Sequence, residues 1–120
     1  MNATLLAKTA YGHASAPVRS AADTEYDAFA RITSRLNAAA PGPETVSALH
    51  ENRRLWTLLG SLVAEPENAL PPETRARILY LAEFTFTHTS KILAGKADRA
   101  ILIEINGAIM RGLRDRVGAA

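Results

Sequence analysis

Few side chains in this chain have the type and spacing that catalysis requires. The three histidines are His13, His50 and His88, and no two of them stand three or four residues apart, as a metal-binding pair on one helix would. The acidic residues are scattered rather than gathered into the facing carboxylate pair that glycoside hydrolysis uses. The chain has no cysteine, which excludes disulfides and thiolate ligands or nucleophiles. We therefore predict no catalytic residue, no metal site, no cofactor and no enzymatic activity.

The strongest chemical signal is the segment Asn52-Arg53-Arg54-Leu55-Trp56-Thr57, which contains the only tryptophan of the chain. Tryptophan and arginine are enriched among the residues that dominate protein interfaces, so the segment indicates binding rather than catalysis. Trp56 shares helical spacing with the apolar residues Leu49, Leu59 and Val63. We therefore expect Trp56 to pack in the core of a helical domain.

The two arginines of this segment have different expected positions. Arg53 lies next to the apolar stripe, whereas Arg54 is further round the helix and is expected in solvent. Two alternatives are open for Arg53. It could form an ion pair with an acid of a neighbouring helix, or it could join Asn52 or Asn106 in a buried polar layer that sets the register of the helices.

Four helical segments must position these residues. Apolar residues recur at spacings of three and four, and proline or glycine separates the segments. The predicted helices span roughly residues 20–39, 44–64, 72–94 and 97–117. The second helix includes Val46 in its buried stripe. The third places His88 on an apolar face, as a hydrogen-bonded core or boundary residue.

The fold class that follows is all-α, a small bundle of about four helices. Residues 19–120 are expected to form a single helical-bundle domain. Residues 1–18 are rich in Ala, Thr and Ser and are expected to form a flexible N-terminal arm. The second and third helices carry apolar arcs wider than one neighbour requires, which leaves apolar surface for a partner.

Composition and charge argue against two further classes, nucleic-acid-binding proteins and membrane proteins. Apolar residues make up 48% of the chain, as in an ordinary globular protein, and the formal net charge is only +2. This near balance argues against direct binding of nucleic acid, which requires a concentrated positive surface. No apolar run is long enough to span a membrane, and the N-terminus lacks the pattern of a signal peptide. We expect a cytoplasmic protein without a membrane partner.

Short motifs occur in a fixed order along the chain: Asn52-Arg53-Arg54-Leu55-Trp56, Pro66-Glu67-Asn68, Ile103-Glu104-Ile105-Asn106 and Gly112-Leu113-Arg114. In this order they resemble the FlaF family, the flagellar biosynthesis regulators of alphaproteobacteria. The resemblance covers nearly the whole chain and is strongest over residues 50–114. No single motif is a catalytic signature, and the ordered series is what makes the resemblance specific.

The resemblance implies a small helical cytoplasmic protein that acts in flagellin synthesis and export, alongside a second regulator, FlbT. In its most concrete form, the implied function is a flagellin-binding secretion chaperone or adaptor whose apolar groove takes the terminal helical segment of flagellin. The alternative is a post-transcriptional regulator of flagellin mRNA that acts directly or through FlbT. Near-neutral charge, and no aromatic stacking platform with interleaved basic residues, argue against direct RNA binding.

On this basis we predict flagellin as the partner, with FlbT as a second candidate partner. The predicted partner-binding residues are arginine, aromatic and asparagine side chains of the motif-bearing helices: Arg53, Arg54, Trp56, Phe84, Phe86, Asn106 and Arg114. They fall on the second, third and fourth predicted helices, so the packing of those helices decides which of them share a surface.

Overall fold

Helices make up the regular structure of the described part of the chain. The computed structural model describes the backbone of residues 21–119 and the side chains of residues 25–112. Within residues 21–119 the elements are α2 (Ala21–Ala38), α3 (Pro43–Ala64), α4 (Pro72–Leu93) and α5 (Ala100–Ala119). The predicted all-α fold is therefore confirmed, with each helix close to its predicted bounds. The predicted N-terminal arm, residues 1–18, lies outside the described residues.

Proline, glycine and one aspartate set several of the helix ends. Pro43 and Pro72 stand in the first turns of α3 and α4, where an absent backbone N–H leaves no hydrogen bond unmade. Beyond the end of α4, Gly95 has a φ of 76°, in the left-handed region that terminates helices. Asp98 lies just before α5, and its Oδ1 accepts a hydrogen bond of 2.9 Å from the backbone N–H of Ala100 in the first turn.

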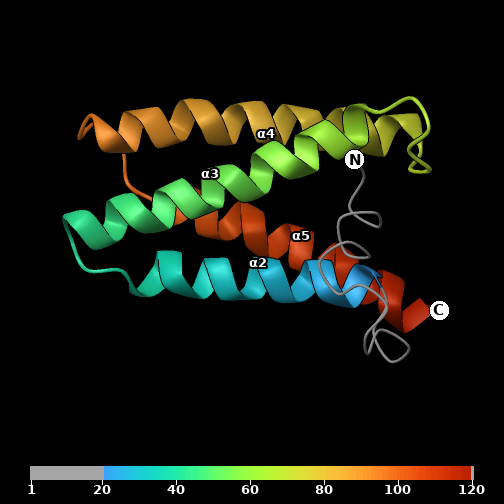
Figure 1. Cartoon of the computed structure of the whole chain (residues 1–120), viewed down its shortest axis with the longest axis horizontal. Coiled ribbons are helices and arrows are strands. Elements are labelled where there is room, and N and C mark those ends of the chain that lie inside the picture. The colour runs from blue at the N-terminus through green and yellow to red at the C-terminus, as the bar shows by residue number, and fades with distance from the viewer. Residues whose placement is uncertain (1–20, 120) are drawn as a thin grey trace.

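The helices pack as two antiparallel pairs (Figure 1). α2 lies against α5, α3 lies against α4, and contacts between α2 and α3 join the two pairs. In Figure 1, α3 runs diagonally from the α2 side of the molecule to the α4 side. Side chains of α3 therefore face both pairs, and they determine how the pairs meet.

Two apolar clusters fill the interior. The first contains Phe29, Trp56 and Ala82, and half-buried side chains of all the described helices pack against it. The second contains Leu36, Ala48, Leu49 and Leu102. The predicted burial of Trp56 is confirmed, because its side chain is 0% exposed and its ring meets Phe29 edge-on with the centroids 5.8 Å apart.

The predicted stripe of the second helix is confirmed at Leu49 and Val63, which are buried, but it is wrong at Val46. Val46 is 52% exposed. It stands seven residues, or about two helical turns, before Arg53, so the two residues share one face of α3. That face is the flank of α3 next to α4, where the Arg53 guanidinium lies over the ring of Phe86.

Polar side chains fix the loop between α3 and α4. The Arg75 guanidinium donates hydrogen bonds of 2.8 Å to the carbonyl oxygens of Val63 and Glu65. Asn68 Nδ2 donates to the Leu62 carbonyl oxygen at 3.1 Å. These donors satisfy carbonyl groups that the last turn of a helix leaves unpaired. Asn68 belongs to one of the ordered motifs, so this motif has a structural role in the loop.

Arg99 links the loop between α2 and α3 to the start of α5. Its guanidinium donates to the carbonyl oxygen of Ala39 at 2.8 Å and to the hydroxyl of Thr45 at 3.0 Å. Together these bonds hold the first turn of α3 close to the end of α2. At the same end of α2 and α3, Arg35 donates a hydrogen bond to the hydroxyl of Ser47.

Candidate functional site

A buried polar layer lies at the inner face of α3. It is made of Thr33 of α2, Asn52 and Trp56 of α3, and Asn106 of α5. Asn106 of α5 is its centre. Its Oδ1 accepts a hydrogen bond of 2.9 Å from Trp56 Nε1, and its Nδ2 donates to Asn52 Oδ1 at 2.8 Å and to Thr33 Oγ1 at 3.0 Å. None of the layer's residues is more than 9% exposed. The layer therefore joins α2, α3 and α5 in one register, because a shift of any helix would orphan buried polar groups.

The indole of Trp56 sets the direction of this hydrogen-bond chain. An indole N–H can only donate, so Asn106 must turn its amide oxygen toward Trp56 and its amide nitrogen toward Asn52. Asn52 then presents its oxygen to Asn106, and its own Nδ2 is buried without a hydrogen-bond partner. Thr85 Oγ1 of α4 is a second buried polar atom of this kind. The hydrogen bonding of the layer is therefore incomplete at Asn52.

Arg53 does not belong to the polar layer, so that alternative is wrong. Its side chain is exposed, and its guanidinium lies over the ring of Phe86 on α4, 6.0 Å from the ring centroid. The contact that the structure gives Arg53 is thus with an aromatic ring rather than with a carboxylate. The reason is its phase, because one residue after Asn52 the side chain is rotated about 100° away from the interior.

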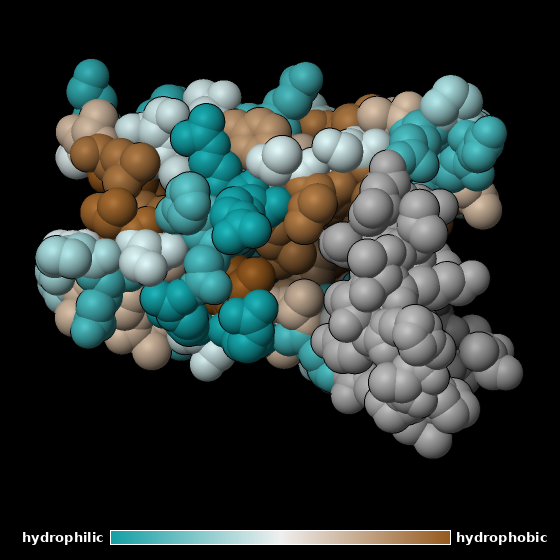
Figure 2. Space-filling view, viewed as in Figure 1, coloured by the Kyte–Doolittle hydropathy of each residue, from teal (hydrophilic) through white to brown (hydrophobic). Residues whose placement is uncertain are grey.

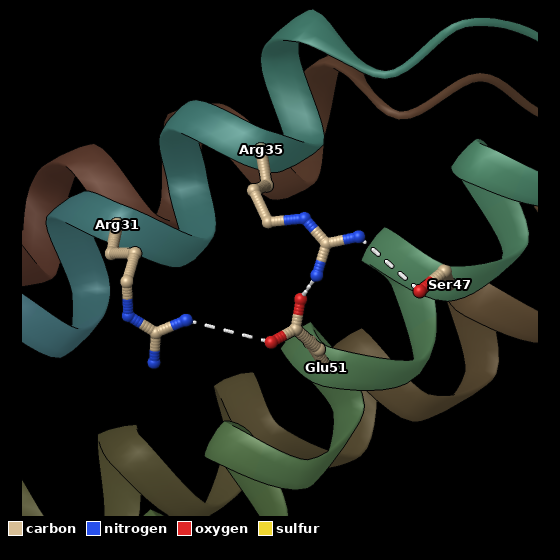
Figure 3. A network of polar contacts seen from close by, with 4 residues as sticks. All are labelled: Arg31, Arg35, Ser47 and Glu51. Atoms are coloured by element: carbon tan, nitrogen blue, oxygen red, sulfur yellow. Dashed lines mark hydrogen bonds and ion pairs between the residues drawn. The ribbon is translucent and has the colours of Figure 1, made fainter.

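On the outer face of α3, two arginines of α2 converge on one carboxylate (Figure 3). Glu51 forms ion pairs with Arg35 and, at 3.5 Å, with Arg31. Arg35 also donates a hydrogen bond of 3.2 Å to the hydroxyl of Ser47. The side chains of Arg31 and Arg35 are 63% and 45% exposed, whereas that of Glu51 is 28% exposed. Most of the guanidinium surface therefore faces solvent while the carboxylate is partly covered.

Arg54 and Leu58 extend this surface along α3. With Ser47 and Glu51 they are spaced four, three and four residues apart, so they form one row on the outside of the helix. Arg54 is exposed, as predicted, and Leu58 is 40% exposed. We refer to Arg31, Arg35, Glu51, Arg54 and Leu58 together as the arginine face. Figure 2 shows hydrophilic side chains over the middle of this side of the molecule, with apolar surface on either side of them.

The two predicted phenylalanines of α4 lie on different sides of their helix. Phe86 packs against the Trp56 cluster and lies under Arg53. Phe84 stacks on His88 with the ring centroids 5.4 Å apart. Both rings are half-buried. Two residues of separation turn side chains about 200° apart on a helix, so Phe84 and Phe86 cannot form one aromatic surface.

His88 is the hydrogen-bonded boundary residue that its spacing predicts. It is half-buried, and its Nε2 lies 2.9 Å from the carbonyl oxygen of Asp98. A carbonyl oxygen accepts only, so Nε2 carries the proton in this contact. His88 thereby ties the last turns of α4 to the segment before α5.

Apolar side chains are also exposed where α3 begins and α4 ends. Val46 and Leu93 are each 52% exposed. Val46 precedes Arg53 by seven residues and Leu93 follows Phe86 by seven, so antiparallel packing brings the two residues to the same end of the pair. Figure 2 shows an apolar patch at that end.

The structure places the predicted partner-binding residues in different environments. Arg53 and Arg54 are exposed, whereas Trp56 and Asn106 are fully buried and cannot reach a partner while the bundle is closed. The side chain of Arg114 lies outside the described residues. The phenylalanines of α4 are half-buried, as described above. Only Arg54 of the predicted set lies on the arginine face.

The sequence predictions missed four members of the arginine face, namely Arg31, Arg35, Glu51 and Leu58. Arg31 and Arg35 stand four residues apart on one predicted helix, and Glu51 stands three before Arg54 on the next. These spacings place each pair on one helical face. They do not say that the two faces meet, because that depends on which helices pack together.

No group of three or more metal-binding side chains comes together among the described residues. None of the described helices has the length and apolar character needed to cross a bilayer.

Comparison with known proteins gives one match. Residues 7–113 match the family model of the flagellar protein FlaF. No curated protein and no solved structure matches the chain significantly. The matched range contains α2, α3 and α4 whole and most of α5.

Proposed function

Since the chain belongs to the FlaF family of flagellar proteins, we propose that it acts in flagellin synthesis and export as a flagellin-binding secretion chaperone or adaptor. The observation that carries the proposal is the family match over residues 7–113, which spans the interior clusters and the arginine face alike. FlaF is not a family of enzymes. The proposal assigns the exposed arginine face to contact with a protein partner.

In the proposed function, the partner segment is the terminal helical part of flagellin. An unassembled amphipathic helix exposes an apolar face, and a chaperone prevents premature association by covering that face. The arginine face offers a counterpart, because Leu58 is 40% exposed and the neighbouring Leu55 is only half-buried. An apolar row on α3 can meet partner side chains spaced by three and four residues.

Co-purification tests this proposal directly. The full chain is bound to a resin and offered full-length flagellin, or flagellin without its terminal helical segment, with and without FlbT. We expect retention of full-length flagellin without FlbT, and loss of retention when the terminal segment is deleted. Retention only in the presence of FlbT would reduce the role to an adaptor that acts through FlbT. Failure of full-length flagellin to bind under every condition would refute the proposal.

The competing function is regulation of flagellin mRNA, directly or with FlbT. The exposed guanidiniums of Arg31, Arg35 and Arg54 favour it, since arginine binds phosphate well. Glu51 argues against it, because its carboxylate lies among these arginines and would repel a phosphate backbone. A gel-shift assay on flagellin leader RNA at physiological salt decides between them. Tight, salt-sensitive binding by this protein alone would favour the mRNA function.

A further inference from the structure

We infer that the arginine face binds an acidic amphipathic helix, with partner carboxylates on Arg31 and Arg54 and partner apolar side chains on Leu58. This inference rests on the proposed function, and it specifies the chemistry of the flagellin segment that would be bound. It concerns a surface on which α2 and α3 contribute together, rather than the predicted aromatic residues of α4.

The charges of the face are unbalanced. The face contains three arginines and one carboxylate, because Arg31 and Arg35 both pair with Glu51 and Arg54 follows Glu51 by three residues on α3. Arg35 is committed to Glu51 and Ser47, whereas Arg31 reaches Glu51 only at 3.5 Å and is 63% exposed. A guanidinium has five N–H donors, so Arg31 keeps most of its donors for another acceptor. Carboxylates are the side chains that accept from two of these donors at once.

The spacing of the face suits a helix. Arg54 and Leu58 are four residues apart on α3, which corresponds to a rise of about 6 Å along the helix axis. A partner helix that lies along α3 and carries an acid and an apolar residue one turn apart would contact both side chains. Arg31 stands on α2, with its guanidinium 3.5 Å from the Glu51 carboxylate of α3. A second acid of the same partner helix would meet it there.

Charge complementarity favours an acidic helix over the other candidate occupants of the arginine face. Residues 1–20 of this chain contain Lys8 and Arg19 but no aspartate or glutamate, so they are the wrong partner for an arginine-rich face. RNA would bring its phosphates close to Glu51, with which they would have like charge. A second copy of the chain could offer exposed acids such as Glu73 and Glu83, and the experiment therefore includes oligomeric state.

The experiment measures the affinity of the full chain for full-length flagellin at about 50 mM and about 500 mM NaCl. The variants are Arg54→Glu, Arg31→Glu and Leu58→Ala, and the matched control is Arg77→Glu, an exposed arginine of α4 outside the arginine face. We expect each arginine-face reversal to weaken binding by at least about tenfold at low salt, because it places like charges opposite one another. Arg77→Glu should change affinity less than twofold.

Four other outcomes would overturn the inference. If wild type binds flagellin and both reversals bind it equally well, the inference fails while the proposed function stands. If wild type binds no flagellin, the proposed function fails and the inference fails with it. If Arg54→Glu converts a dimer to a monomer in sedimentation, a second copy is the occupant. If leader RNA binds and Arg54→Glu abolishes that binding, RNA is the occupant.

Discussion

The inner and outer faces of α3 both present polar side chains, but their surroundings differ. On the inner face, Asn52 and Trp56 are 0% exposed and share hydrogen bonds with Asn106. On the outer face, Glu51 forms ion pairs with two arginines of α2, and Arg54 is exposed to solvent. Buried polar groups lose their water and must keep their partners, so they resist change in the fold. Exposed charges keep their water, contribute little to stability, and are free to meet a partner.

The largest expected effect tests the inner face at its apolar centre. Trp56→Ala should lower the free energy of unfolding by about 3–5 kcal/mol, because it empties a fully buried site and removes a hydrogen bond to Asn106. Urea unfolding followed by circular dichroism measures this loss. An unchanged urea midpoint would mean that Trp56 does not support the fold, and the contrast between the two faces would collapse.

The next effect tests the polar centre of the same face. Asn106→Ala removes the acceptor of Trp56 Nε1 and the donor to Asn52 and Thr33, so we expect a loss of about 2–4 kcal/mol. The same urea titration measures it. The matched control is Asn37→Ala, since Asn37 is an exposed asparagine of α2. Equal effects of the two substitutions would show that the polar layer adds no stability of its own.

A third substitution should stabilise the protein. Thr85 Oγ1 is buried without a hydrogen-bond partner, so Thr85→Val replaces an unpaired hydroxyl with a methyl group of similar size. We expect a gain of about 1 kcal/mol in thermal or urea unfolding. The control is Thr89→Val, which removes a hydroxyl that donates to the Thr85 carbonyl oxygen at 2.6 Å and should not stabilise. Destabilisation by Thr85→Val would reveal a partner for its hydroxyl.

The smallest effect belongs to the boundary between the faces. Arg53→Ala removes the contact with the Phe86 ring, and the expected loss of stability is about 0.5–1 kcal/mol. Arg53→Lys keeps the positive charge but loses the planar group, and serves as the comparison. Unfolding of the alanine variant would assign Arg53 to the interior network after all.

Particular residues show how much of the structure could be predicted from the sequence. Helical spacing predicted the helices and the burial of Trp56, because a single periodicity determines which face of a helix is apolar. The same reasoning failed at Val46, which is apolar but lies on the exposed flank of α3 that carries Arg53. A polar layer with Asn52 or Asn106 was one of two alternatives for Arg53, and the layer exists without Arg53. Its members include Thr33 of α2, whose spacing places it on the buried face of that helix but does not name its partner on α5.

The arginine face shows more clearly what the sequence could not predict. Arg54 was predicted from its own helix, and it is exposed as expected. Arg31 and Arg35 were not, because their role depends on the packing of α2 against α3. Local spacing fixes which side chains share a helix face, whereas the pairing of helices depends on contacts between residues far apart in the chain. The candidate site lies at such a pairing, so the sequence alone could supply only half of it.

The most direct test of this account is flagellin retention by the Arg54→Glu variant, with the urea midpoint measured on the same preparation. We predict that the variant no longer retains flagellin. Its free energy of unfolding should stay within about 0.5 kcal/mol of the wild-type value, because Arg54 is an exposed side chain. Flagellin retention equal to wild type, or loss of flagellin together with a clearly lower midpoint, would contradict the separation of a stabilising inner face from a binding outer face.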